Sequence, residues 1–183
     1  MTATGHREQA FERLFRDTRT DLLAYVLRRS RTDEDAADVF AETYLIAWRR
    51  LDAMPVGDQA RPWLFGVARN LLLKGATHRR SNLALVERLA SELRAVRAAN
   101  TPVEGDRSDA LRAALAALPE PDREILTLSA WEGLTPRQIA TVVGRPPNVV
   151  RVRLHRARAR LRRELGPSQA NRPAEYATAE TDW

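Results

Sequence analysis

The chain has 183 residues, which is room for one ordinary domain or two small ones. It holds no cysteine, so disulfides, thiolate zinc sites and cysteine nucleophiles are excluded. Thirty basic and 24 acidic residues give a formal net charge of +6, and 29 of the basic residues are arginine. The sequence shows neither a signal-peptide core nor an apolar run able to span a bilayer, so we expect a cytoplasmic chain without membrane insertion.

Frequent alanine, leucine and arginine, with few β-branched alternations, predict an all-α chain. Apolar spacing predicts a first helix over residues 11–27. Carboxylates at 33–35 predict the start of a second helix, because the helix dipole favours negative charge there. Five side chains are expected to face inward along this second helix: Val39, Phe40, Tyr44, Leu45 and Trp48. After a break at 52–60, Pro62 opens a third helix that runs to Lys74.

The composition around residue 100 predicts a division of the chain. Residues 99–108 combine turn formers and acids without apolar periodicity, which is typical of a flexible linker. We therefore expect a helical N-terminal domain over 1–98 and a helical C-terminal domain over 109–166. The polar tail 167–183 is expected to be disordered.

Residues 135–148 have the pattern of a helix-turn-helix. Thr135 can cap a short helix, Pro136 tolerates its first position, and Gln138 can bond back to the cap. Gly144 then breaks the helix. Asn148 is expected to cap the helix that follows.

This following helix carries the strongest signal in the chain. Residues 145–163 contain eight arginines and no acid, and without them the chain has 22 basic and 24 acidic residues. The apolar residues fall on one stripe with helical spacing: Val150, Leu154, Ala157, Leu161 and Leu165. A basic helix could also serve a membrane surface or an acidic partner. The capped helix and glycine turn upstream favour nucleic acid.

Together, two separated stretches resemble a known family. Residues 35–49 (DAADVFAETYLIAWR) and 61–71 (RPWLFGVARNL) are similar to characteristic parts of the extracytoplasmic-function (ECF) sigma factors, and so are residues 118–124 (LPEPDRE), Gln138-Ile139-Ala140 and residues 153–158 (RLHRAR). The resemblance covers roughly residues 11–165 in the expected order. The chain departs from the family at Ala41, often glutamine, at Pro147-Asn148-Val149, commonly Val-Gly-Thr, and at Gly75, in a helix usually free of glycine.

The resemblance implies two small helical domains, the second a helix-turn-helix, and three interfaces. The acidic helix would bind RNA polymerase core through Asp35, Asp38, Glu42 and Trp48. The third helix would handle the minus-ten promoter element, with Arg61, Trp63, Arg69, Asn70, Lys74, Arg79 and Arg80 as candidates. The minus-thirty-five element would be read by Arg137, Asn148, Arg151, Arg153, Arg156, Arg158 and Arg160.

The positions of the minus-thirty-five arginines along the helix and relative to its apolar stripe divide them into two groups. Arg151 and Arg153, near the start of the helix, are the expected base readers, because arginine can bond two acceptors on guanine. Arg156, Arg158 and Arg160 are expected on phosphates, which give affinity without sequence information. For the minus-ten element, an aromatic ring in a basic surface suits unstacked bases.

Three other classes of function remain to be weighed. The scattered histidines and the lack of a phosphate loop or metal-ligand spacing do not favour an enzyme, so we expect neither cofactor nor metal. A stand-alone helix-turn-helix repressor or activator is the main alternative. An adaptor without DNA specificity is the third. The expected partners are polymerase core, promoter DNA and an anti-sigma factor that restrains the protein.

Overall fold

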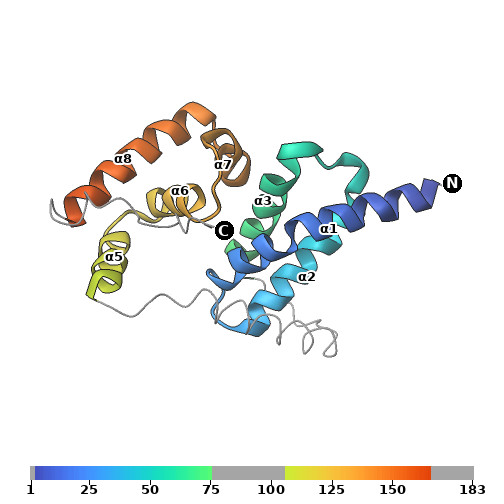
Figure 1. Cartoon of the computed structure of the whole chain (residues 1–183), viewed down its shortest axis with the longest axis horizontal. Coiled ribbons are helices and arrows are strands. Elements are labelled where there is room, and N and C mark those ends of the chain that lie inside the picture. The colour runs from blue at the N-terminus through green and yellow to red at the C-terminus, as the bar shows by residue number, and fades with distance from the viewer. Residues whose placement is uncertain (1–2, 76–105, 166–183) are drawn as a thin grey trace, which may run out of the picture.

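The computed structural model describes residues 3–75 and 106–165, and within these two ranges its regular structure is entirely helical (Figure 1). The N-terminal unit contains α1 (Ala3–Leu27), α2 (Asp33–Arg49), two short 3-10 turns (Leu51–Ala53 and Gly57–Gln59) and α3 (Ala60–Leu73). The C-terminal unit contains α5 (Asp106–Ala116), α6 (Glu120–Ala130), α7 (Pro136–Val143) and α8 (Pro147–Leu165). The all-α prediction is confirmed. The tail 167–183 lies outside the described residues, as does most of the predicted linker.

Three predicted boundaries differ from the observed ones. α3 begins at Ala60, two residues before Pro62. α5 begins at Asp106, so residues 106–108 are helical and do not belong to a linker. α8 begins at Pro147, which places Asn148 inside the first turn and not at the cap. Proline fits these first turns because a backbone N–H there has no intrahelical partner to lose.

The N-terminal unit is built on an aromatic cluster between α1 and α2. The Phe11 ring meets the Trp48 ring edge-on at 5.2 Å, and Phe15 meets Tyr44 at 4.8 Å. The Tyr44 hydroxyl is bonded to the Thr18 hydroxyl at 2.8 Å. Leu45, which the sequence predicted to face inward, is instead 40% exposed. Its position falls on the outer side of α2, opposite the buried Tyr44 and Ala47.

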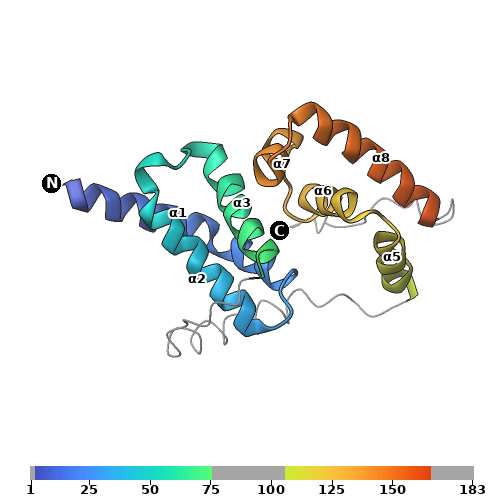
Figure 2. The ribbon, with the colours of Figure 1, turned by 180° about the vertical axis from the view of Figure 1, so that it is seen from behind.

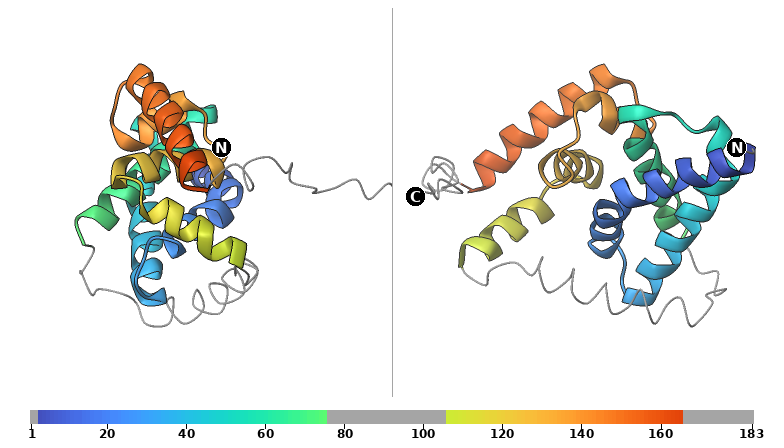
Figure 3. Two further views of the ribbon diagram at one scale, coloured as in Figure 1. Left: turned by 90° about the vertical axis from the view of Figure 1, so that its left-hand side faces the viewer. Right: turned by 45° about the vertical axis from the view of Figure 1, so that its right-hand side comes forward.

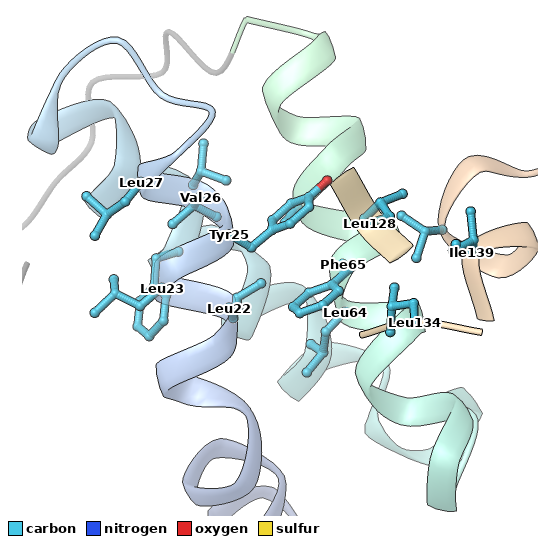
Figure 4. Close-up of a cluster of buried hydrophobic side chains, with 14 of the residues drawn as sticks. Leu22, Leu23, Tyr25, Val26, Leu27, Leu64, Phe65, Leu128, Leu134 and Ile139 are labelled. Atoms are coloured by element: carbon cyan, nitrogen blue, oxygen red, sulfur yellow. The ribbon is translucent and has the colours of Figure 1, made fainter. Parts of the chain in front are cut away.

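The two units, predicted from the sequence as helical domains joined by a flexible linker, also share one hydrophobic core. Tyr25 of α1 stacks on Phe65 of α3, with ring centroids 4.8 Å apart. Leu128 and Ile139, from α6 and α7, belong to the same buried cluster, and Figure 4 shows them facing these two rings. In both front and rear views, α7 lies beside α3 (Figures 1 and 2).

Gly66 allows α3 and α7 to approach closely. A Cβ placed on Gly66 would lie 3.6 Å from the Thr141 carbonyl oxygen and from the Val142 Cα. A methyl group therefore fits there in ordinary contact, but any longer side chain would meet the backbone of α7. The glycine thus sets the spacing between the two units.

The environment of the Tyr25 hydroxyl predicts how the stability of the fold depends on pH. It is buried, and it finds no hydrogen-bond partner among the described residues. Burial raises the pKa of Tyr25 to about 12, against the opposing field of Arg29. The native state therefore holds this proton more tightly than the unfolded state, and stability should fall as pH rises from the ordinary value of 10.0 to about 12.

We expect Tyr25→Phe to change the free energy of unfolding at neutral pH by less than about 1 kcal/mol, because no hydrogen bond is lost. Its stability should also decline less at alkaline pH. Tyr44→Phe is the matched control, because it breaks the bond to Thr18 and should cost about 1 kcal/mol. Chemical denaturation at neutral and alkaline pH measures both effects. A loss for Tyr25→Phe as large as the loss for Tyr44→Phe would show that the Tyr25 hydroxyl is bonded.

Candidate nucleic-acid and polymerase interfaces

The helix-turn-helix forms as its sequence predicts. The Thr135 hydroxyl accepts a hydrogen bond from the Gln138 backbone N–H, and the Gln138 side chain accepts one from the Thr135 backbone N–H. This reciprocal pair closes a capping box at the start of α7. Gly144 ends the helix with φ at 64°, a left-handed conformation that glycine adopts without strain. The turn fixes the angle at which α8 leaves α7.

The outward face of α8 differs from the one inferred from the sequence. Val150, Leu154 and Ala157 are buried, as predicted. At about 3.6 residues per turn, the side of the helix opposite this stripe carries Asn148, Val152, His155, Arg156, Ala159 and Arg163, all of them exposed. Arg151 and Arg153 lie on the two flanks. The outward centre of the helix is thus less basic near its start than the arginine count suggests, and Val152 is 49% exposed there.

Two arginines of α8 bind within the C-terminal unit. An Arg153 nitrogen lies 3.2 Å from the Asp122 carboxylate of α6, and Arg158 donates to the Ser129 hydroxyl at 3.1 Å. Both side chains therefore lean back toward α6. Arg151, Arg156 and Arg160 are exposed, as is Arg137 on α7. The right-hand view of Figure 3 shows α8 along the outer edge of the C-terminal unit.

The minus-ten candidates on α3 are brought together, but beside the C-terminal unit. Trp63, Arg69 and Asn70 line a pocket of about 280 Å³ whose other wall is formed by α7 residues 141–143 and Gly144. Trp63 is half-buried against the core, and Lys74 is exposed just beyond the end of α3. Arg79 and Arg80 lie outside the described residues.

Two of these candidates are held by groups of the C-terminal unit. Arg69 forms a two-pronged ion pair with Glu124 of α6, at 2.6 and 2.8 Å. This hydrogen bonding raises the pKa of Arg69 further, in spite of its partial burial. Arg61 donates to the Glu132 carbonyl at 2.9 Å and pairs with Asp21 of α1 at 2.8 Å.

Glu132 is a functional candidate that sequence reasoning missed. It is only 4% exposed, and its carboxylate lies 2.7 Å from Arg28 and 3.3 Å from Arg29, both at the end of α1. The side chain belongs to the loop after α6, yet both arginines lie in the N-terminal unit. A glutamate between Trp131 and Gly133 reads as an ordinary turn residue, so no local signal could have found it.

The acidic helix α2 presents a mixed face. Asp35, Asp38 and Glu42 share one side of the helix with the exposed Leu45, because all four fall at helical spacing. Trp48 does not join this face. Its ring packs on Phe11, and the Arg7 guanidinium lies 5.6 Å from the ring centroid. Sequence reasoning missed Leu45 because its apolar character suggested a place in the core.

A wider hollow lies between the two units on the side of α1 and α6. It has a volume of about 620 Å³ and is lined by apolar and basic side chains that include Arg28, Arg123, Leu73 and Trp131. Within the described ranges we found neither a group of three histidine and carboxylate side chains able to hold a metal nor a helix suited to crossing a membrane.

Comparison with known proteins identifies both units. Residues 14–82 match the family model for sigma-70 region 2, and residues 108–161 match the model for sigma-70 region 4. The RNA polymerase sigma factor SigL of Mycobacterium tuberculosis is 33% identical over 181 residues, covering 91% of this chain and 97% of SigL. A probable sigma factor, RfaY of Xanthomonas campestris, is 32% identical over 164 residues, or 86% of this chain, but the match spans only 41% of RfaY.

Solved structures agree with this assignment. The chain is similar to CnrH, solved in complex with the cytosolic domain of CnrY, with a TM-score of 0.55 and 25% identity over 84% of this chain and 86% of that one. It shares its fold with the sigma factor RpoE of Bartonella quintana, solved with the anti-sigma factor NepR, at a TM-score of 0.54 and 23% identity over 83% and 92%. The chain therefore belongs to the ECF sigma factors of the sigma-70 family, which are transcription initiation factors of RNA polymerase, and not to the stand-alone helix-turn-helix regulators.

Proposed function

We propose that this sigma factor reads the minus-thirty-five element with the outward face of α8, holds the minus-ten strand on α3, and docks on polymerase core through α2. The observation that carries the proposal is the separation of these three surfaces. Each lies on a different helix with its own chemistry, and all three helices belong to one folded body. No step needs a catalytic group, because the task consists of binding and strand opening. Such a protein works where the bacterial polymerase does, in the cytoplasm.

The exposed side chains of α8 support a role in the major groove. A recognition helix contacts base edges with its outward face and phosphates with its flanks. Val152, His155 and Arg156 occupy this outward face. Arginine can bond guanine, and an apolar side chain can contact the thymine methyl group. We therefore propose Val152, His155 and Arg156 as base readers, with Arg151, Arg153, Arg158 and Arg160 beside the phosphates.

The composition of α3 supports single-strand binding. Trp63 offers an aromatic surface on which an unstacked base can lie, and Arg69 and Lys74 supply positive charge for the backbone. Asn70 is exposed between them and can bond to a base edge. Arg61, the second residue of α3, is a further basic candidate.

The mixed face of α2 supports docking on a protein. Asp35, Asp38 and Glu42 lie in line with Leu45 on one face of α2, and apolar surface bordered by polar groups is typical of a protein interface. The sequence suggests Asp35, Asp38, Glu42 and Trp48 for this surface. We add Leu45 and leave out Trp48, because the Trp48 ring packs against Phe11.

An anti-sigma partner is the remaining part of the proposal. CnrH and the Bartonella RpoE were each solved with a second protein bound, an anti-sigma factor in the RpoE structure. The hollow of about 620 Å³ between the two units of this chain combines apolar and basic walls. An amphipathic helix with acidic residues would complement both, and we propose such a helix as the element with which the partner binds.

The experiment that tests the function is transcription with purified core polymerase. The chain should confer specific initiation on core enzyme at promoters selected from a library. A regulator that works alone would instead bind duplex operators without polymerase and would leave core unable to initiate.

Charge reversal on α2 tests the docking surface. We expect Asp38→Arg combined with Glu42→Arg to weaken association with core by about tenfold or more, because like charges then face the partner. The matched control is Glu8→Arg with Glu12→Arg, two exposed glutamates at the same spacing on α1. Titration of labelled chain with core measures both variants. Equal affinity for the two double variants would remove these carboxylates from the interface.

Alanine substitutions on α8 separate base reading from charge. Arg156→Ala should cost about 1–3 kcal/mol at one promoter position and relax the preference there. Arg160→Ala should weaken binding to all sequences and lower the salt slope by about one unit. Binding of matched and mismatched minus-thirty-five duplexes at several salt concentrations separates these effects. Arg153→Ala belongs in the same series, because selective loss there, with uniform loss at Arg156, would support the sequence-based assignment over ours.

A further inference from the structure

We propose that the packed arrangement of the two units is an autoinhibited state of the free sigma factor. In this state, α6, α7 and Glu132 of the C-terminal unit occupy the surface of α3 that binds the minus-ten strand. The proposal rests on the proposed minus-ten role of α3. It adds a regulatory device that works without an anti-sigma factor.

The first argument comes from the arginines of α3. Glu124 holds Arg69 with two hydrogen bonds, at 2.6 and 2.8 Å, in the geometry that guanidinium also uses for phosphate. The Glu132 carbonyl holds Arg61 at 2.9 Å. A phosphate of a bound strand would need the same guanidinium donors, so the C-terminal unit and the strand compete for them.

The second argument is steric. α7 forms the far wall of the pocket that contains Trp63 and Asn70, and at Gly66 the helices are separated by no more than a methyl group. The edge of the contact is further held by a hydrogen bond of 3.2 Å between the Thr141 hydroxyl and the Gln59 side chain. A nucleotide stacked on Trp63 from this side would have to displace α7.

The third argument is that Glu132 makes the closed state specific. Its side chain is 2% exposed and pairs with Arg28 and Arg29, and both of these partners belong to the N-terminal unit. A buried carboxylate without its arginines is costly, so closed arrangements that fail to bring these three side chains together are disfavoured. When the two units separate, Glu132, Arg28 and Arg29 return to water together. The contact is therefore expected to open as a whole and not in steps.

The surfaces left uncovered indicate how the state opens. The outward face of α8 is exposed in the closed arrangement, and α2 lies on the side of the N-terminal unit away from α7 and α8 (Figures 1 and 2). Polymerase core can therefore dock on α2 while α3 is still covered. Opening then becomes a consequence of core binding, and the free protein does not engage single strands.

The test uses the full chain, whose lack of cysteine allows two spin labels to be placed uniquely. Thr20→Cys on α1 and Ala113→Cys on α5 are both exposed. The parent chain should give one short, narrow distance. Glu132→Gln and, separately, Glu124→Arg should lengthen and broaden it. Asp122→Asn is the matched control, because its ion pair with Arg153 lies within the C-terminal unit.

A charge-swapped variant distinguishes opening of the contact from misfolding. Arg69→Glu combined with Glu124→Arg restores an ion pair of opposite polarity and should return the short distance. Circular dichroism and thermal unfolding establish that each variant retains its helices. A broad distance in the parent chain, or a short one in both opening variants, would overturn the proposal.

The functional readout is the anisotropy of a fluorescent single-stranded oligonucleotide of random sequence. If the open state rises from about one tenth to nearly all of the population, the apparent dissociation constant should fall about tenfold. Adding Trp63→Ala should abolish this gain. An opened chain whose affinity matches that of the parent would overturn autoinhibition while leaving the minus-ten site in place. A gain that persists with Trp63→Ala would instead show that α3 is not the strand-binding surface.

Discussion

The contact between α3 and α7 depends on keeping a buried carboxylate paired. Glu132 is almost completely removed from water, and its charge is balanced by Arg28 and Arg29 of the other unit. Because an unpaired buried charge is unfavourable by several kcal/mol in general terms, the two units hold a defined position as long as all three side chains meet. The pocket at Trp63, which lies between α3 and α7, depends on this same relation.

α3 serves two purposes that share its surface. Its apolar residues, including Leu64 and Phe65, complete the core, and its polar residues are proposed to bind a DNA strand. In a helix of 14 residues these two sets alternate closely, so a partner that packs on one set must lie near the other. The ion pair of Arg69 with Glu124 is a direct result. A helix exposed for DNA binding would otherwise leave apolar surface in water.

α8 is attached to the core by a narrow buried stripe and keeps the rest of its surface exposed. Only Val150, Leu154 and Ala157 are fully covered, so most of the helix circumference remains available for charge. The arginines of the flanks can lie along α6, as Arg153 and Arg158 do, without burying their charged ends. The concentration of positive charge on one helix then gives the C-terminal unit its attraction for a polyanion.

The sequence by itself determined everything that depends on near neighbours along the chain. The capping box of Thr135 and Gln138, the left-handed Gly144 and the buried stripe of α8 were all predicted correctly, because caps and helical periodicity are local. Only the tertiary structure decided that Leu45 faces outward, that Arg153 turns toward Asp122, and that Glu132 joins the two units. These outcomes depend on which helices meet: the carboxylate of Glu132 and the guanidinium of Arg28 are more than a hundred residues apart in sequence. Local pattern carries no information about such a pairing.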